Sequence, residues 1–129
     1  MGDMSGKIVY ENESFLITGA IFEVYRTMGS GFLEDVYQDC LRREFILRNI
    51  PFVEKPSLDI YYKEEKIEHH YIPDFVCFGN IILEIKAASN LVDEHYGQLK
   101  NYLAATGFKR GLLVNFHEQP KVHVRRMVL

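Results

Sequence analysis

The sequence of 129 residues has no long apolar run and no segment typical of secretion. No stretch approaches the ~20 consecutive apolar residues that a membrane-spanning helix requires. The N-terminal residues also lack the apolar core of a signal peptide. We therefore expect a cytoplasmic protein that has no membrane partner.

Cysteine is scarce, with Cys40 and Cys77 as the two thiols of the chain. They lie far apart, outside any metal-ligand spacing, and each has apolar neighbours, so we expect buried, reduced thiols. The sequence also lacks an HExxH motif, a paired CxxC and a glycine-rich phosphate loop. Zinc-dependent and nucleotide-fold interpretations therefore have no support.

Positive charge is not in excess either, since the formal net charge is −3. An acidic balance weighs against the simplest form of nucleic-acid binding, because proteins that bind phosphate backbones are usually basic. The C-terminal segment has the opposite charge balance, which is compatible with a local basic surface beside an acidic site. Its charged residues are Lys109, Arg110, Lys121, Arg125 and Arg126, opposed by Glu118.

The pattern that is present predicts a single α/β domain over residues 1–129, a length that suits one core. Residues 1–12 are expected to be a weakly ordered lead-in, and an apolar stripe at helical spacing begins after Ser14. The Gly-Ser-Gly segment at 29–31 ends this helix, and a second helix is expected over 33–48.

Most of the remaining elements alternate at a period of two, which is typical of strands. We expect a buried central strand over 81–87, because its residues are apolar on both faces apart from two positions, and a helix over 92–105. The order of elements is then α-α-β-β-β-α-β-β, which predicts a mixed central sheet flanked by helices. The other expected strands are 52–62, 66–78, 110–116 and the edge-like 121–128, with a turn at 63–65.

Glu84 and Lys86 interrupt the apolar strand 81–87. Alternation places both side chains on one face of the strand, about 7 Å apart. Burial of a carboxylate and an ammonium is costly unless they are paired or bind a metal. A buried structural ion pair without function therefore remains one interpretation of these residues.

Asp74 is the polar exception in the preceding apolar run. A tight turn at residues 79–80 makes the two strands antiparallel neighbours, and counting outward from the turn brings Asp74 within reach of Glu84. Two carboxylates at close range repel each other, and a divalent cation relieves this repulsion. Because Mg²⁺ prefers one or two carboxylates together with waters and phosphate oxygens, we expect Asp74 and Glu84 to bind Mg²⁺ or Mn²⁺.

Five short segments form an ordered set of motifs: 31–37 (GFLEDVY), 73–74 (PD), 84–86 (EIK), 98–103 (QLKNYL) and 111–116 (GLLVNF). The Pro-Asp pair, followed after nine residues by Glu-Ile-Lys, resembles the signature of the PD-(D/E)XK nuclease superfamily. The other segments are similar to those of its prokaryotic GxxExxY family, in the RecB-like branch. The resemblance covers about residues 14–128 and implies a restriction-endonuclease-like αβββαβ core.

The resemblance also implies roles for single residues. Asp74 and Glu84 match the acids that bind the metal. Lys86 matches the lysine that positions or activates the attacking water, or stabilises the charged phosphorane. Glu34 resembles an additional metal-binding acid that RecB-like enzymes supply from the first core helix.

Gln98 and Tyr102 resemble the Q-x-x-x-Y motif of RecB-like enzymes. Their spacing places both on one face of a helix, where they would contact substrate or brace the site. The sequence departs from the family at Ile72, where many relatives have a basic residue. His95 lies one turn before Gln98, and its role is left open.

Several residues also have simpler interpretations. Tyr37 and Tyr102 fit packing better than chemistry, because aromatic residues at helical spacing usually pack. Gln98 is also explained as the cap of a buried carbonyl, and Glu34 as an acid favoured in the first turn of a helix. His70 has the strand parity that faces the acids, but packing or solvation explains it as well.

The function implied is metal-dependent hydrolysis of phosphodiester bonds in nucleic acid, with DNA favoured over RNA. Two alternatives remain: a catalytically silent module that binds nucleic acid or protein on the same fold, and a metal-stabilised interaction protein. A domain this small covers little nucleic acid alone, which is compatible with a homodimer.

Overall fold

The computed structural model describes residues 2–89 and 93–129, and the side chains of residues 12–89 and 93–129. The helices are α1 (Gly2–Met28), α2 (Glu34–Leu47) and α3 (Asp93–Thr106). The strands are β1 (Phe52–Glu54), β2 (Leu58–Tyr62), β3 (Glu65–Tyr71), β4 (Phe75–Cys77), β5 (Ile81–Lys86), β6 (Arg110–Asn115) and β7 (Val124–Val128). This content confirms the predicted α/β class.

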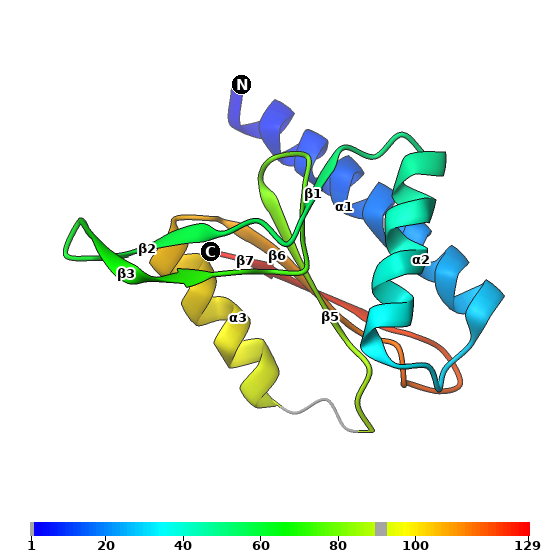
Figure 1. Ribbon diagram of the computed structural model, residues 1–129. Coiled ribbons are helices and arrows are strands. Elements are labelled where there is room, and N and C mark those ends of the chain that lie inside the picture. Colours follow the sequence, from blue (N-terminus) through cyan, green and yellow to red (C-terminus); the bar gives the residue numbers. More distant parts are fainter. Residues whose placement is uncertain (1, 90–92) are drawn as a thin grey trace.

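The helices α1 and α2 pack together against one face of the main sheet (Figure 1). α1 begins at Gly2 rather than at Ser14, and no proline interrupts the residues between them. The expected lead-in, residues 1–12, lies almost entirely outside the described side chains. Within the part of the chain that the structure describes, no helix is long and apolar enough to cross a membrane. The stripe that α1 buries includes the predicted Ile17, Ile21 and Val24.

The main sheet has five strands in the order β1-β4-β5-β6-β7. β5 lies at the centre, as its apolar faces predicted, and β7 lies at the edge. β5 and β6 are parallel because α3 crosses over between them, whereas the other neighbouring pairs are antiparallel. The sheet is therefore mixed, as predicted.

The two long strands predicted over 52–62 and 66–78 are each divided in the structure. The first breaks at Lys55, which has a φ of 49°, and the second breaks near Pro73, which has no amide hydrogen to donate. β1 and β4 stay in the main sheet, whereas β2 and β3 form a separate hairpin that projects from the body (Figure 1). Positive φ angles at residues 63–64 close its tip, where a turn was predicted.

The two faces of the main sheet are covered differently. Leu83 and Ile85 of β5 pack toward α1 and α2, whereas Ile82 packs toward α3 and the hairpin. Glu84 and Lys86 alternate with Leu83 and Ile85 along β5, so they lie on the opposite face of the sheet, which α3 covers. Their predicted placement on one face is confirmed, and this face carries the candidate site.

Both cysteines are free thiols, as expected. Cys77 lies in the core, and burial raises the pKa of its thiol to about 12. Cys40 on α2 is only partly buried, so the expected full burial holds for Cys77 alone.

Candidate functional site

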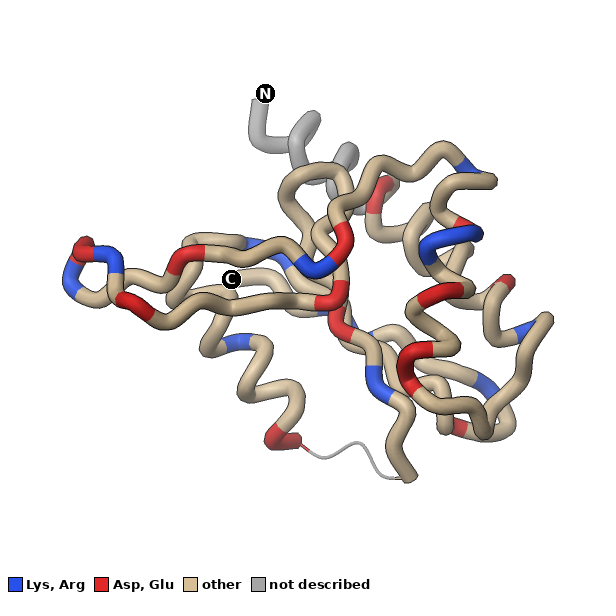
Figure 2. The backbone as a smooth tube through the Cα atoms, in the orientation of Figure 1, with Lys and Arg blue, Asp and Glu red and all other residues tan. Residues whose placement is uncertain are grey.

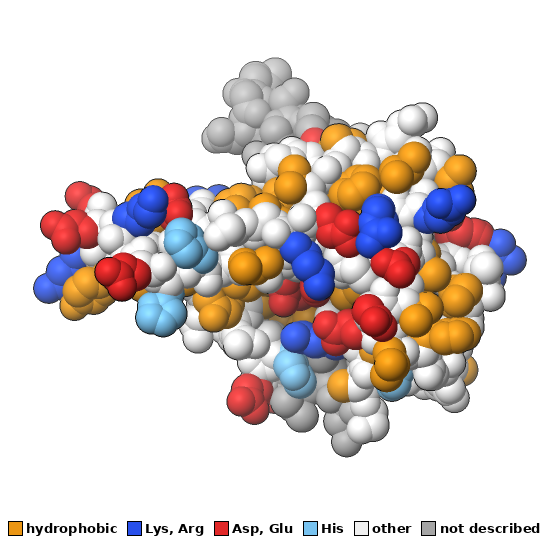
Figure 3. Space-filling view, viewed as in Figure 1, with side chains coloured by type: hydrophobic (Ala, Val, Ile, Leu, Met, Phe, Trp, Pro, Cys, Tyr) orange, Lys and Arg blue, Asp and Glu red, His pale blue; other side chains and the backbone are white. Residues whose placement is uncertain are grey.

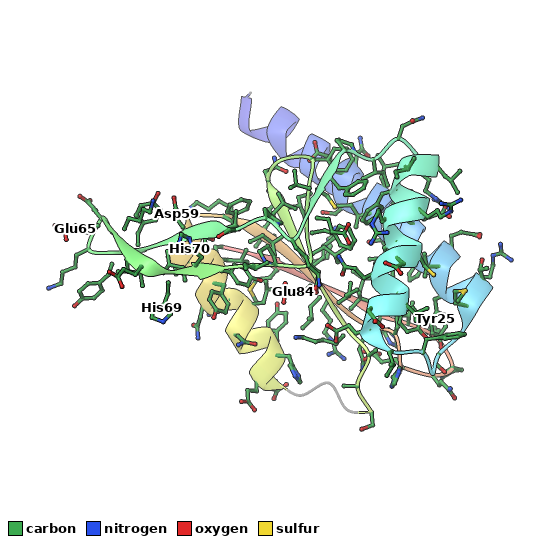
Figure 4. The ribbon with its side chains drawn as sticks, viewed as in Figure 1. Tyr25, Asp59, Glu65, His69, His70 and Glu84 are labelled. Carbon is green, nitrogen blue, oxygen red and sulfur yellow. The ribbon has the colours of Figure 1, made fainter. Side chains whose placement is uncertain are left out.

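The tight hairpin between β4 and β5 brings Asp74 and Glu84 together. Its register pairs Phe75 with Leu83, and the next position outward sets Asp74 opposite Glu84. The Asp74 amide donates a hydrogen bond to Oε1 of Glu84 at 3.0 Å, and the Ile85 amide donates to Oδ2 of Asp74 at 2.8 Å. Figure 4 shows Glu84 where β5 passes between α2 and α3 in this view. The proximity that the turn predicted is therefore present.

Burial makes both carboxyl groups weaker acids. It raises the pKa of Asp74, against the hydrogen bond from Ile85 and the charges of Lys86 and Lys55. Burial and then the charge of Asp74 raise the pKa of Glu84 to about 7. Without a cation, Glu84 therefore keeps its proton to a higher pH than an ordinary glutamate does. A bound cation would favour the ionised form of both groups.

Glu34, in the first turn of α2, reaches the same cluster. The residue is exposed as a whole, but burial of its carboxyl and then the charge of Asp74 raise its pKa. The charge of Lys86 and the Ala87 amide oppose this shift. The acid expected from a helix thus lies near enough to Asp74 to be affected by its charge, although its position in the first turn also fits the helix-dipole explanation. Figure 2 shows acidic and basic residues gathered where α2, β4 and β5 approach one another.

A cleft of about 280 Å³ opens on the α3 face of β5. In Figure 3, acidic, basic and histidine side chains gather around a hollow in the middle of the visible face. Among the histidines of β3, His70 lines the cleft and His69 is not among its described lining residues. The polar lining comes from His70, Tyr71, Glu84, Lys86, His95, Gln98 and Tyr102.

α3 presents Gln98 and Tyr102 to this cleft, as their spacing predicted. The Tyr102 ring stacks on Tyr71 of β3, with centroids 4.0 Å apart and planes 5° apart, so the packing interpretation holds for the ring. The buried Tyr71 hydroxyl lies near enough to Glu84 to lower the pKa of that carboxyl, but among the described residues it has no partner at normal hydrogen-bond geometry. Gln98 is exposed and makes no hydrogen bond within the described residues, which argues against its role as a cap.

Tyr37, which ends the segment GFLEDVY, braces the loop before α2. Its hydroxyl donates to the Gly29 carbonyl at 2.6 Å and accepts from the Phe32 amide at 3.3 Å. Its ring stacks on Phe116 at 4.2 Å. These contacts fix the start of α2 and thereby the position of Glu34, in agreement with the packing interpretation of Tyr37.

Gln38 and its partners are supports that the sequence interpretation missed. The buried Gln38 amide donates to the Asp74 carbonyl at 3.2 Å and to Oε2 of Glu54 at 2.8 Å. Arg42 donates to Oε1 of Glu54 at 2.7 Å. This network ties α2 to the main chain of Asp74. The sequence signal that could have revealed Gln38 is its polar side chain on the buried stripe of α2, three positions before Leu41.

Asn115 is a second missed support, at the end of β6. Its side-chain oxygen accepts from the Ala88 amide at 3.1 Å, and its side-chain nitrogen donates to the Ala88 carbonyl at 2.9 Å. The two bonds fix the chain directly after Lys86. Asn115 is almost fully buried, and its polar character within the apolar run 110–116 could have revealed it.

Most of the basic C-terminal residues lie away from the cleft. Arg126 pairs with Leu112, whose side chain packs on the α1 face of the sheet, and Lys121 and Arg126 line a separate cavity against α1. Lys109 and Arg110 line another cavity at the end of β6 opposite to the acids. The basic surface expected beside the acidic site is therefore not formed by these four residues.

The acids of the site suit a hard cation such as Mg²⁺. One oxygen of Asp74 and one of Glu84 accept amide hydrogen bonds, which leaves a second oxygen on each for a ligand. Within residues 12–89 and 93–129, no three His, Cys, Asp or Glu side chains converge tightly enough to form a complete protein cage. Mg²⁺ does not need one, because it keeps several waters and binds through one or two carboxylates.

The α/β fold, with its mixed five-stranded sheet, is consistent with that of a nuclease superfamily. A family model described as the PD-(D/E)XK nuclease superfamily matches residues 11–127. The chain belongs to this superfamily. No curated protein and no solved structure matches the chain significantly.

Proposed function

We propose that this protein is a metal-dependent nuclease that hydrolyses phosphodiester bonds of nucleic acid, with Mg²⁺ or Mn²⁺ as cofactor. The observation that carries the proposal is the meeting of Asp74 and Glu84 on the face of β5 that also presents Lys86 to the cleft. Superfamily membership supports it. DNA is favoured over RNA, and the segments 31–37 and 98–103 favour the GxxExxY family.

Each residue has a distinct task in this proposal. Asp74 and Glu84, with Glu34, would hold a divalent cation, which supplies Lewis-acid chemistry toward a phosphodiester. The Lys86 ammonium would stabilise the negative charge that develops on the phosphate oxygens in the transition state. Gln98 would contact the nucleic acid from α3.

The proposal predicts that Asp74→Asn, Glu84→Gln and Lys86→Ala each abolish cleavage. Combining any two should add little further loss, because residues that act as a unit give non-additive effects. The assay compares single- and double-stranded DNA and RNA in Mg²⁺, in Mn²⁺ and in EDTA. Lys100→Ala, an exposed lysine on α3, is the matched control and should cleave normally. Full activity in any of the three site variants contradicts the assignment.

A binding module without catalysis is the second candidate. The net charge of −3 and the distance of most C-terminal basic residues from the cleft favour a protein partner over nucleic acid for such a module. A silent module that binds nucleic acid instead predicts salt-dependent binding with no cleavage in either metal. An interaction protein without a nucleic-acid role would show neither binding nor cleavage.

A further inference from the structure

Lys55 lies at the kink between β1 and β2, directly against the main chain of Asp74. Its φ of 49° ends β1, and its amide donates to the Asp74 carbonyl at 3.0 Å. The preceding residue, Glu54, is held by Gln38 and Arg42 from α2. The kink is therefore fixed from two sides, and the position of Lys55 is fixed with it.

The side chain of Lys55 is exposed and makes no ion pair within the described residues. Its charge nevertheless lowers the pKa of Asp74 and Glu34. Lys86 acts on the same two acids and is also the lysine that acts on Glu84. The two ammonium groups therefore act on the same acids from different elements, Lys86 from β5 and Lys55 from the end of β1.

We infer that Lys55 is a second phosphate-binding residue, which holds a backbone phosphate next to the one that Lys86 contacts. The inference rests on the proposed nuclease function and names the ligand as a polynucleotide with at least two neighbouring phosphates. An ammonium that has no carboxylate partner within ion-pair distance keeps its charge for a ligand. It loses no ion pair when the phosphate arrives, which makes the contact more favourable than one from a paired lysine.

The test replaces Lys55 and compares it with a lysine of the same backbone conformation. Lys55→Asn removes the charge, and asparagine tolerates the positive φ. Lys63→Asn is the control, because Lys63 is also exposed with a φ of 49° but lies at the hairpin tip. Lys55→Asn should raise KM for an oligonucleotide several-fold with kcat unchanged. It should also reduce the slope of log binding constant against log salt concentration by about 0.9 for a duplex or about 0.7 for a single strand.

Two further measurements complete the test. Lys55→Arg should restore the wild-type KM, and a dinucleotide with a single phosphodiester should not distinguish Lys55→Asn from wild type, because it lacks the neighbouring phosphate. Equal KM values and salt slopes in Lys55→Asn and Lys63→Asn would overturn the inference, as would a lower kcat with unchanged KM. If Lys55→Asn melts below the control, Lys55→Gln provides the same comparison. A wild type that neither binds nor cleaves nucleic acid would instead overturn the proposed function, and the inference with it.

Discussion

Glu84 shows how strongly the surroundings of one residue set its chemistry. Its neighbours Leu83 and Ile85 are fully buried in the core, and Asp74 lies directly across the hairpin. Burial and the nearby negative charge both disfavour the ionised form, and the hydrogen bond from the Asp74 amide, the Tyr71 hydroxyl and the charge of Lys86 only partly offset them. The proposed function gives these features a purpose, because a divalent cation at Glu84 would remove the repulsion and favour the ionised form.

In the metal-free protein, the free energy of unfolding should fall as the pH rises from about 4.5 to about 7. The folded-state pKa of Glu84 is about 7, above its ordinary value of 4.5, so the folded state holds the proton more tightly. The stability from this group is complete below about pH 4.5 and is lost as the pH rises through about 7. The loss is at most a few kcal/mol, at about 1.4 kcal/mol per unit of pKa shift.

This pH effect is measured by urea unfolding in EDTA at a series of pH values, with Glu84→Gln as the comparison. The variant keeps the shape of the side chain but does not titrate, so its stability should depend less on pH over this range. Parallel curves for the two proteins would contradict the assignment of the effect to Glu84. The raised pKa of Asp74 adds to the effect in the same direction.

At the scale of the element, α3 is the part of the cleft wall that can be changed without disturbing the acids. Gln98→Ala should weaken substrate binding or turnover while leaving metal affinity and melting temperature intact, because the Gln98 side chain is exposed and makes no hydrogen bond with the part of the chain that the structure describes. Tyr102→Phe keeps the ring stacked on Tyr71 and removes only the hydroxyl. Reduced turnover in this variant would assign the hydroxyl to the substrate.

Steady-state kinetics and melting curves check these α3 variants. Asn101→Ala, an exposed change on the same helix, is the control and should behave as wild type. Unchanged kinetics in Gln98→Ala, together with a lower melting temperature, would favour a packing role instead.

Elements with local determinants were predictable from the sequence, and those that depend on tertiary contacts were not. The turn at 79–80 and the strand period were enough to bring Asp74 to Glu84, because both rules act over a few residues. The division of 52–62 also had a local signal, because Pro56 in its middle has no amide hydrogen to donate to a strand. The exact course of the chain there was not predictable, since it depends on the positive φ of Lys55 and on the network of Gln38, which joins segments distant in the sequence.

At the scale of the whole molecule, a cation would join acids from separate parts of the fold. Glu34 comes from α2, whereas Asp74 and Glu84 come from the β4–β5 hairpin. In the folded state the charge of Asp74 raises the pKa of both Glu34 and Glu84, and a bound cation would relieve this repulsion. Stability and metal binding should therefore be linked through the entire domain.

Mg²⁺ or Mn²⁺ should raise the melting temperature of the wild type. A cation at 100 times its dissociation constant contributes about 2.7 kcal/mol, or on the order of 10 °C for a domain of this size. Asp74→Asn should be at least as stable as wild type in EDTA and should lose most of the metal response. A structural Glu84–Lys86 pair predicts no metal effect, so a flat response in the wild type would remove the cation from consideration.

The short hairpin between Asp74 and Glu84 also determines when the acids meet during folding. A hairpin closes in about 1–10 μs, and a short loop loses little entropy on closure. The parallel pairing of β5 with β6 is slower, because it must wait for the crossover through α3. We therefore predict that the two acids meet before the cleft around them forms. Divalent cations in a refolding buffer should thus act on the rate at which the chain reaches its native state, as well as on its final stability.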